Sequence, residues 1–224
     1  MAPEVEGDFW EDGVVERPLP VKSDELPDDP WLREIARLAP SAARERLVAR
    51  WSAVHRPGTA AVRDRLIDYT PVAVASHDDE ESLKLVGPDG SAVYLAPPLA
   101  DDELAAVASL PARDRPTAEE FYRGFAGLRA SPPGYSGDYV LPRDWMTFGE
   151  FGWNLDEDDE SWGDATVIFI ALNGDLLLLG EAGVAWGVMA GGGVRRIDDD
   201  LDGFLVRHAE HLGAGGRLDS YVDL

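Results

Sequence analysis

The residues of this chain that could do chemistry are mostly carboxylates, since there are 43 Asp and Glu and no Cys. Without cysteine, disulfides, zinc thiolates and cysteine nucleophiles are all excluded. The densest group of acids is the run Asp-Glu-Asp-Asp-Glu at residues 156–160, and Asp164 follows closely. Such a run can bind calcium through its oxygens or present a negative face to a basic protein.

Three interpretations of this acidic run remain open. A calcium loop of the EF-hand type needs glycine at its sixth position and glutamate at its twelfth, and neither occurs when counting from Asp156. A partner-binding surface would combine the carboxylates with neighbouring aromatic anchors. A solvated acidic loop is the third interpretation, because charge runs usually are exposed faces. The candidate partner-binding residues are Trp153, Asp156, Glu157, Asp158, Asp159, Glu160 and Trp162.

Other motifs that could carry chemistry are better explained by a structural role in the fold. His208 and His211 are spaced to share a metal, but His208 falls on an apolar stripe and is expected to be a packed core histidine. Residues 191–193 (Gly-Gly-Gly) follow a strand but lead to another strand, which favours a hairpin loop over a phosphate site. Ser136 lacks the setting of a nucleophile elbow. We therefore predict no catalytic residue, no cofactor and no metal ligand.

Net charge is the outlying property of the chain. The 43 acidic and 20 basic side chains give a formal net charge of −23. A field of this sign repels phosphate backbones, so no nucleic acid is expected as a partner, whereas a basic protein would be attracted. The alternative is that the acidity only maintains solubility or reflects the source organism.

Hydropathy bears on location. No stretch of eighteen apolar residues occurs, and the first ten residues are acidic rather than basic. We therefore expect neither a membrane span nor a signal peptide, and the expected location is the cytoplasm.

Proline and capping residues predict three short helices in the N-terminal half. Asp29 followed by Pro30 has the pattern of an N-cap and a first helical residue. Pro40 is expected to end this helix, Ser41 to cap the second and Thr59 to cap the third.

Turn signals predict the strands. Residues 83–86 and 92–95 flank Gly-Pro-Asp-Gly at 87–90, which predicts a hairpin. Asn173-Gly174 predicts a second hairpin between two apolar runs, which should be central strands. Residues 117–120 (Thr-Ala-Glu-Glu) match the capping box of a helix.

Together these patterns predict an α+β fold, in which an antiparallel meander sheet is backed by helices and the N-terminal region is helical. The acids at 198–200 are expected at the start of the last helix, where a helix dipole favours negative charge. The expected organisation is a loosely ordered arm at 1–27, a helical region with a hairpin at 28–109, an α+β domain at 110–213 and a tail at 214–224.

Three features of the C-terminal half occur in a recognisable order. They are a short helix with an aromatic–glycine step at 121–128, an irregular stretch around Trp145, and an apolar hairpin followed by a strand and a closing helix with Leu-Asp-Gly-Phe-Leu at 201–205. Together they resemble the SMI1/KNR4-type domain of the SUKH superfamily. The resemblance covers residues 110–212, about half of the chain.

The resemblance implies a binding protein without a cofactor. Members of the family are mostly bacterial immunity proteins that bind and neutralise toxins, often nucleases, and a few are regulatory scaffolds. We therefore expect a non-catalytic protein whose partner is a basic toxin domain. Two alternatives remain open: a cytoplasmic regulatory or scaffold protein with a non-toxin partner, and a hydrolase that depends on carboxylates.

Overall fold

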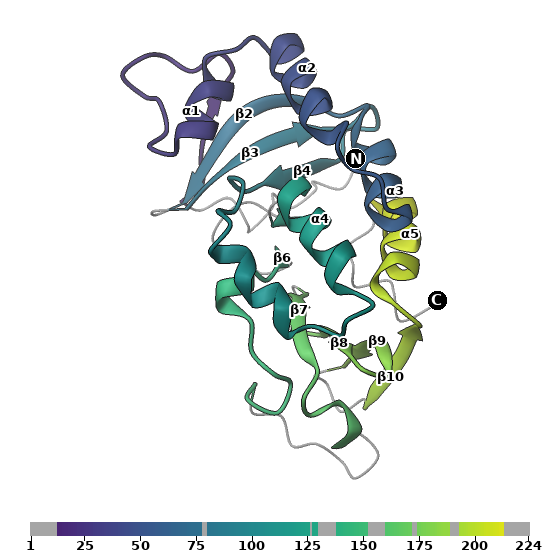
Figure 1. Cartoon of the computed structure of the whole chain (residues 1–224). Helices are drawn as coiled ribbons and strands as arrows, with labels where there is room; N and C mark the ends of the chain where they lie inside the picture. The colour runs from purple at the N-terminus through teal and green to yellow at the C-terminus, as the bar shows by residue number, and fades with distance from the viewer. Residues whose placement is uncertain are drawn as a thin grey trace, which may run out of the picture.

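The chain has an α+β fold in which helices cover an antiparallel sheet (Figure 1). The structure is a computed structural model and describes residues 13–77, 80–125, 127–129, 138–151, 160–171, 174–188 and 193–212. Its helices are α1 (Pro30–Ala36), α2 (Pro40–Trp51), α3 (Pro57–Leu66), α4 (Arg115–Phe125) and α5 (Leu201–His211), with the 3-10 helices η1 (Glu103–Ser109), η2 (Pro142–Asp144) and η3 (Glu160–Trp162). Its strands are β1 (Val15–Pro18), β2 (Thr70–His77), β3 (Glu80–Val86), β4 (Ala92–Leu95), β5 (Leu128–Arg129), β6 (Asp138–Tyr139), β7 (Thr166–Ile170), β8 (Leu176–Gly180), β9 (Gly183–Gly187) and β10 (Val194–Asp198).

The ten strands of the described residues lie in the sheet in chain order, and each pairs antiparallel with the next. This meander confirms the predicted fold class. The sheet is narrowest in the middle, where β5 and β6 share a single residue pair, Arg129 with Asp138. The wider parts are formed by β1–β4 and by β7–β10, and in Figure 1 helix α4 lies between them.

The first described segment is part of this sheet. Strand β1 pairs with β2 along all 4 of its residues, and Leu19 and Val21 directly after it are buried. Residues 13–27 therefore differ from the expected loosely ordered arm, because strand pairing and burial hold them. The rest of that arm, residues 1–12, lies outside the described residues.

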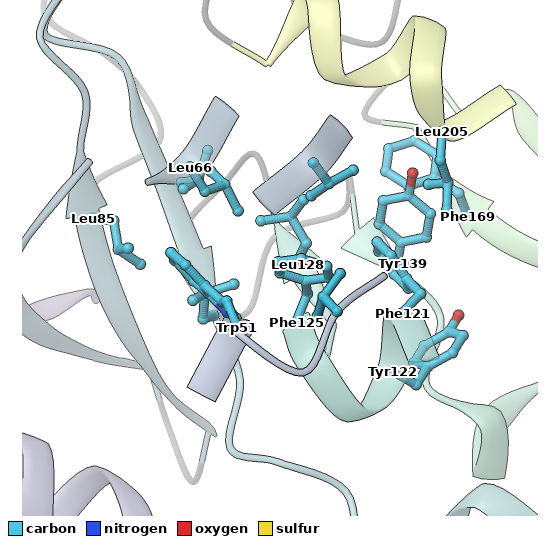
Figure 2. Packing of buried hydrophobic residues seen from close by; sticks show 14 of the residues in the cluster. Trp51, Leu66, Leu85, Phe121, Tyr122, Phe125, Leu128, Tyr139, Phe169 and Leu205 are labelled. Atoms are coloured by element: carbon cyan, nitrogen blue, oxygen red, sulfur yellow. The ribbon is translucent and has the colours of Figure 1, made fainter. Parts of the chain in front are cut away.

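One hydrophobic core includes residues from both of the predicted regions, 28–109 and 110–213 (Figure 2). Trp51 of α2 and Phe125 of α4 have ring centroids 5.7 Å apart. The indole Nε1 of Trp51 also donates a hydrogen bond to the carbonyl oxygen of Gly124 at 3.2 Å. Within the described residues, the two regions share this core.

Strand β8 is covered on both faces. Successive side chains of a strand point to opposite faces, and accordingly Leu177 and Leu179 belong to the main core while Leu176 and Leu178 belong to a second cluster around Phe148. All residues of β8 are buried. The prediction of a central strand from this apolar run is confirmed.

The predicted hairpin turn at 87–90 is also confirmed. Val86 of β3 faces Ala92 of β4, and the Gly87 amide donates to the carbonyl of Ser91 at 2.8 Å. Gly90 has a φ of 85°, which suits glycine. In the second predicted hairpin, Gly174 has a φ of 86° between the paired strands β7 and β8, and position 173 lies outside the described residues.

The helix starts follow the prediction only in part. Asp29 caps α1, since its Oδ1 accepts from the Leu32 amide at 2.8 Å, and Pro30 is the first residue of that helix. The expectation that Pro40 ends α1 and that Ser41 caps α2 is wrong, because α2 begins at Pro40 itself without a side-chain cap. The fixed φ of proline suits the first helical position, so Pro40 starts a helix.

The lengths of the helices bear on the membrane. The longest described helix, α2, has 12 residues, whereas crossing the hydrocarbon core takes about 20. No helix in the described ranges has the length and apolarity that a membrane span requires.

The different roles of Asp29 at α1 and Ser41 in α2 lead to a prediction about stability. Replacing Asp29 with Ala should lower the free energy of unfolding by about 1 kcal/mol, because the Leu32 amide loses its acceptor. The matched control Ser41→Ala should change it by less than about 0.5 kcal/mol, since Ser41 makes no capping bond. Urea unfolding of both variants measures the difference, and equal losses would show that Asp29 does not act as a cap.

Candidate functional site

A hollow with mostly acidic walls opens beside α1, the start of β3 and η1. Its volume is about 370 Å³. Its charged lining residues are Asp28, Asp29, Glu80, Glu81, Glu103, Arg129 and Arg143, and its uncharged ones are Ala96, Pro97, Pro98, Leu99 and Leu141. Carboxylates outnumber guanidinium groups in this lining, so the hollow favours a positively charged ligand over an anion.

Residues far apart in the chain form this hollow because they lie at the starts of elements. The two aspartates precede α1, and Glu80 and Glu81 begin β3. Glu103 begins η1, and its Oε2 accepts from the backbone amide of Ala100 at 2.9 Å. The acids are thus positioned by backbone that is itself held by the sheet and by capping bonds.

Two arginines neutralise part of the acidic lining. Arg129 Nη1 lies 2.8 Å from Glu80 Oε2, and Arg143 Nη1 lies 2.8 Å from Glu103 Oε1. A carboxylate has about four lone-pair sites, so Glu103, which accepts from the Ala100 amide and from Arg143, keeps acceptor capacity for a further donor.

Two further acids of the lining, Glu81 and Asp28, also have arginine neighbours. Glu81 pairs with Arg17 and accepts from the Asp28 amide at 3.2 Å. The carboxylate of Asp28 is fully exposed, with a relative accessibility of 109%, and its Oδ1 lies 3.4 Å from Arg33. Asp28 is therefore the lining carboxylate most open to a lysine or arginine of another protein.

Glu120 of α4 shows a different use of a carboxylate, because it caps α3. Its Oε1 accepts from the backbone amides of His55 and Arg56, each at 2.8 Å, and from the hydroxyl of Thr59. Burial tends to raise the pKa of Glu120, but the hydrogen bonds from Thr59, Arg56 and His55 outweigh it and lower this pKa. Glu120 therefore remains ionised while it holds the start of α3.

Asp202 of α5 reaches the same helix start. Its Oδ1 accepts from the Gly58 amide at 2.9 Å, and its Oδ2 accepts from Arg56 Nη2 at 2.9 Å and from Thr117 Oγ1 at 2.7 Å. A Cβ on Gly58 would lie 2.7 Å from the Asp202 carbonyl oxygen, so only glycine allows this approach of α3 to α5.

Two sequence predictions fail at this junction. The capping box at 117–120 is not formed, because α4 already begins at Arg115 and both Thr117 and Glu120 face other helices. Thr59 does not cap α3, because that helix begins at Pro57 and places Thr59 in its first turn. In both cases a side chain that has the type of a local cap bonds to a distant segment.

Asp114 is a third carboxylate that caps the start of a distant helix, here α5. Its Oδ1 accepts from the Leu201 amide at 2.8 Å and its Oδ2 lies 3.1 Å from Arg113 Nε. Burial is the main cause that raises its pKa, although both contacts act against the shift. Asp200 also caps α5, accepting from the Gly203 amide at 2.8 Å, as the acidic run at 198–200 predicts.

The structure places few of the predicted partner-binding residues. Trp153, Asp156, Glu157, Asp158 and Asp159 lie outside the described residues, and Glu160 is described only as the first residue of η3. Trp162 is 7% exposed and packs in the second cluster with Phe148 and Val167. Its ring therefore supports the sheet in this structure and does not offer an open anchor.

His208 is a core residue, as predicted. It is 2% exposed, and its ring centroid lies 5.6 Å from that of Tyr139 and 5.7 Å from that of Phe204. The side chain of His211 lies outside the described residues. In the part of the chain that the structure describes, no group of three or more His, Asp and Glu could hold a metal ion.

The acidic hollow was not predicted, and the sequence holds no signal for it. Its acids come from three separate segments, and only the pairs 28–29 and 80–81 are adjacent. Each resembles any other exposed acid in a chain with 43 of them.

Comparisons with known proteins add no relative. No family model, no curated protein and no solved structure matches this chain.

The capping role of Glu120 predicts a pH-dependent stability. Replacing Glu120 with Gln should lower the free energy of unfolding at neutral pH by about 1–2 kcal/mol, because a charged acceptor becomes neutral. A carboxylate with a lowered pKa stabilises the fold above its unfolded pKa, and this stabilisation is lost as the pH falls through the folded pKa. The variant should therefore lose less stability on acidification than the wild type does.

Urea unfolding at pH values from about 3 to 7 measures this effect. The matched control is Glu119→Gln, since Glu119 is half exposed and makes a single ion pair with Arg123 at 3.1 Å. Parallel pH curves for the wild type and the Glu120 variant would contradict the capping role.

Proposed function

We propose that this protein binds a basic protein domain without catalysis and acts as an immunity protein that neutralises a basic toxin domain. One observation carries the proposal. The chain has 43 acidic and only 20 basic side chains, and most of the basic side chains form ion pairs with acids of the same chain. Arg17, Arg33, Arg129 and Arg143 all lie within ion-pair distance of carboxylates around the acidic hollow.

The acids that remain have no such internal role. Asp24, Glu45, Asp102 and Glu181 are exposed and make no ion pair within the described residues. Exposed surplus charge of one sign attracts an oppositely charged partner and raises the association rate. A cationic protein surface is the partner that this distribution fits.

The acidic hollow supplies a contact for such a partner. Its volume of about 370 Å³ is ample for the end of an arginine or lysine side chain. There the exposed carboxylate of Asp28 and the carboxylate of Glu103 can accept its N–H donors. Binding by occlusion of the partner's own active surface needs no catalytic group on this chain.

The resemblance to the SMI1/KNR4-type domain supports the toxin as the partner. A basic regulatory partner would fit the same surface, and the protein encoded by the adjacent gene distinguishes the two. A toxin there supports immunity, whereas a metabolic or structural protein contradicts it.

The hollow can be tested with one pair of charge reversals. Asp28→Lys should weaken the complex with the protein encoded by the adjacent gene at least about tenfold, because it places a cation where the partner's cation binds. The control Asp24→Lys makes the same charge change at an exposed residue outside the hollow. Binding measured by surface plasmon resonance at low and high salt separates them, and equal weakening by both variants would remove the hollow from the interface.

The acidic run can be tested separately. Changing Asp156, Glu157, Asp158 and Asp159 to their amides should slow association and abolish growth rescue of cells that express the adjacent toxin. The matched control changes Asp24, Glu45, Asp102 and Glu181 to their amides, which removes the same charge from scattered positions. If both sets act equally, only net charge matters and the run is no contact. If the wild type itself neither binds nor rescues, the proposed function is wrong.

A further inference from the structure

A second hollow lies between the end of α2, the following loop and α4. Its volume is about 400 Å³. Its charged lining residues are Arg50, Arg56, Arg123, Glu119 and Glu120, and the rest of the lining is formed by Ala53, Val54, Pro116 and Gly124. The hollow thus combines an apolar wall with a surplus of arginine, in a chain whose net charge is −23.

Most of the charges in this hollow are already matched. Arg56 lies 2.9 Å from Asp202, and Arg123 lies 2.8 Å from Asp101 and 3.1 Å from Glu119. The Oε1 of Glu120 is occupied by the donors at the start of α3.

Arg50 is the exception. Within the described residues it has no carboxylate at ion-pair distance, and burial alone lowers its pKa, to about 10. Its guanidinium lies over the ring of Trp31, 5.3 Å from the centroid, and donates one hydrogen bond to the carbonyl of Arg123. A guanidinium has five N–H donors, so donors remain for a further acceptor.

A purely structural role explains only part of this arrangement. The Arg123 carbonyl belongs to the last turn of α4, whose carbonyls lack helical partners. One N–H of Arg50 satisfies it and holds α2 to α4. The remaining positive charge is partly desolvated and is uncompensated by any described acid, which is the situation in which an anion binds.

We propose that this hollow binds a small organic monocarboxylate. The carboxylate would pair with Arg50, and the hydrocarbon part would lie against Val54 and Pro116. The planar guanidinium fork matches carboxylate geometry, and the volume is that of a small-molecule site. A single uncompensated cation fits a single negative charge, and the overall charge of the protein disfavours anions that carry several.

Binding is tested on the full-length protein with benzoate and hexanoate as probes. Both should bind saturably in NMR titrations and shift the indole signal of Trp31, which contacts Arg50. Benzyl alcohol has nearly the same shape as benzoate but no charge, and inorganic phosphate has charge but no hydrocarbon; both should bind at least about tenfold more weakly. Equal binding of either one, or no saturable shift with the carboxylates, would overturn the proposal.

Variants locate the site. Arg50→Met keeps the length of the side chain and removes its charge, and should weaken benzoate binding at least about tenfold. Arg50→Lys keeps the charge and should retain part of the affinity. The control Arg46→Met removes an exposed arginine of the same helix that pairs with Glu34 at 2.9 Å, and should leave binding unchanged. Equal loss in the Arg46 and Arg50 variants would overturn the assignment, and the wild-type titration decides the case if Arg50→Met does not fold.

Discussion

The arrangement of helices depends on how the first turn of α3 is satisfied. The first amides of any helix lack partners within it, and α3 has no side-chain cap from its own N-cap residue, Arg56. Glu120 of α4 and Asp202 of α5 supply the missing acceptors. Because each carboxylate also accepts from other donors, three helices are joined at one point, and Gly58 lets two of them approach closely. Figure 1 shows the resulting side-by-side arrangement of α3 and α5.

This use of carboxylates divides the acidity of the chain into two parts. Asp29, Asp114 and Asp200 also bind amides at helix starts, where the helix dipole favours negative charge. These acids have a structural task that a neutral amide would perform less well. The other acids lie mostly at the surface: some pair with arginines, as Asp28 does, and others such as Asp24 and Glu45 make no ion pair within the described residues. The proposed cationic partner would be attracted by these surface acids.

The sequence predicts features whose physical cause is local. The turn at 87–90, the cap at Asp29 and the central strand β8 depend on neighbouring residues or on one continuous apolar run, and the structure has all three. Thr59 and the Thr-Ala-Glu-Glu at 117–120 have local capping patterns too, but their partners lie about 60 to 85 residues away in the chain. A single sequence contains no signal for such pairs. The acidic hollow is hidden for the same reason, since its walls meet only in the folded sheet.

The uncompensated charge of Arg50 follows from the same constraint. Glu120 is an acid in the lining of the hollow that contains Arg50, yet it does not pair with Arg50. Its Oε1 is instead held by the amides at the start of α3, and hydrogen bonds to a charged acceptor stabilise a fold more than an ion pair near the surface does. Capping α3 therefore leaves one cation of α2 without a carboxylate in the described structure. Val54 and Pro116 line the same hollow, so a carboxylate with a hydrocarbon part could pair with Arg50 and pack against them.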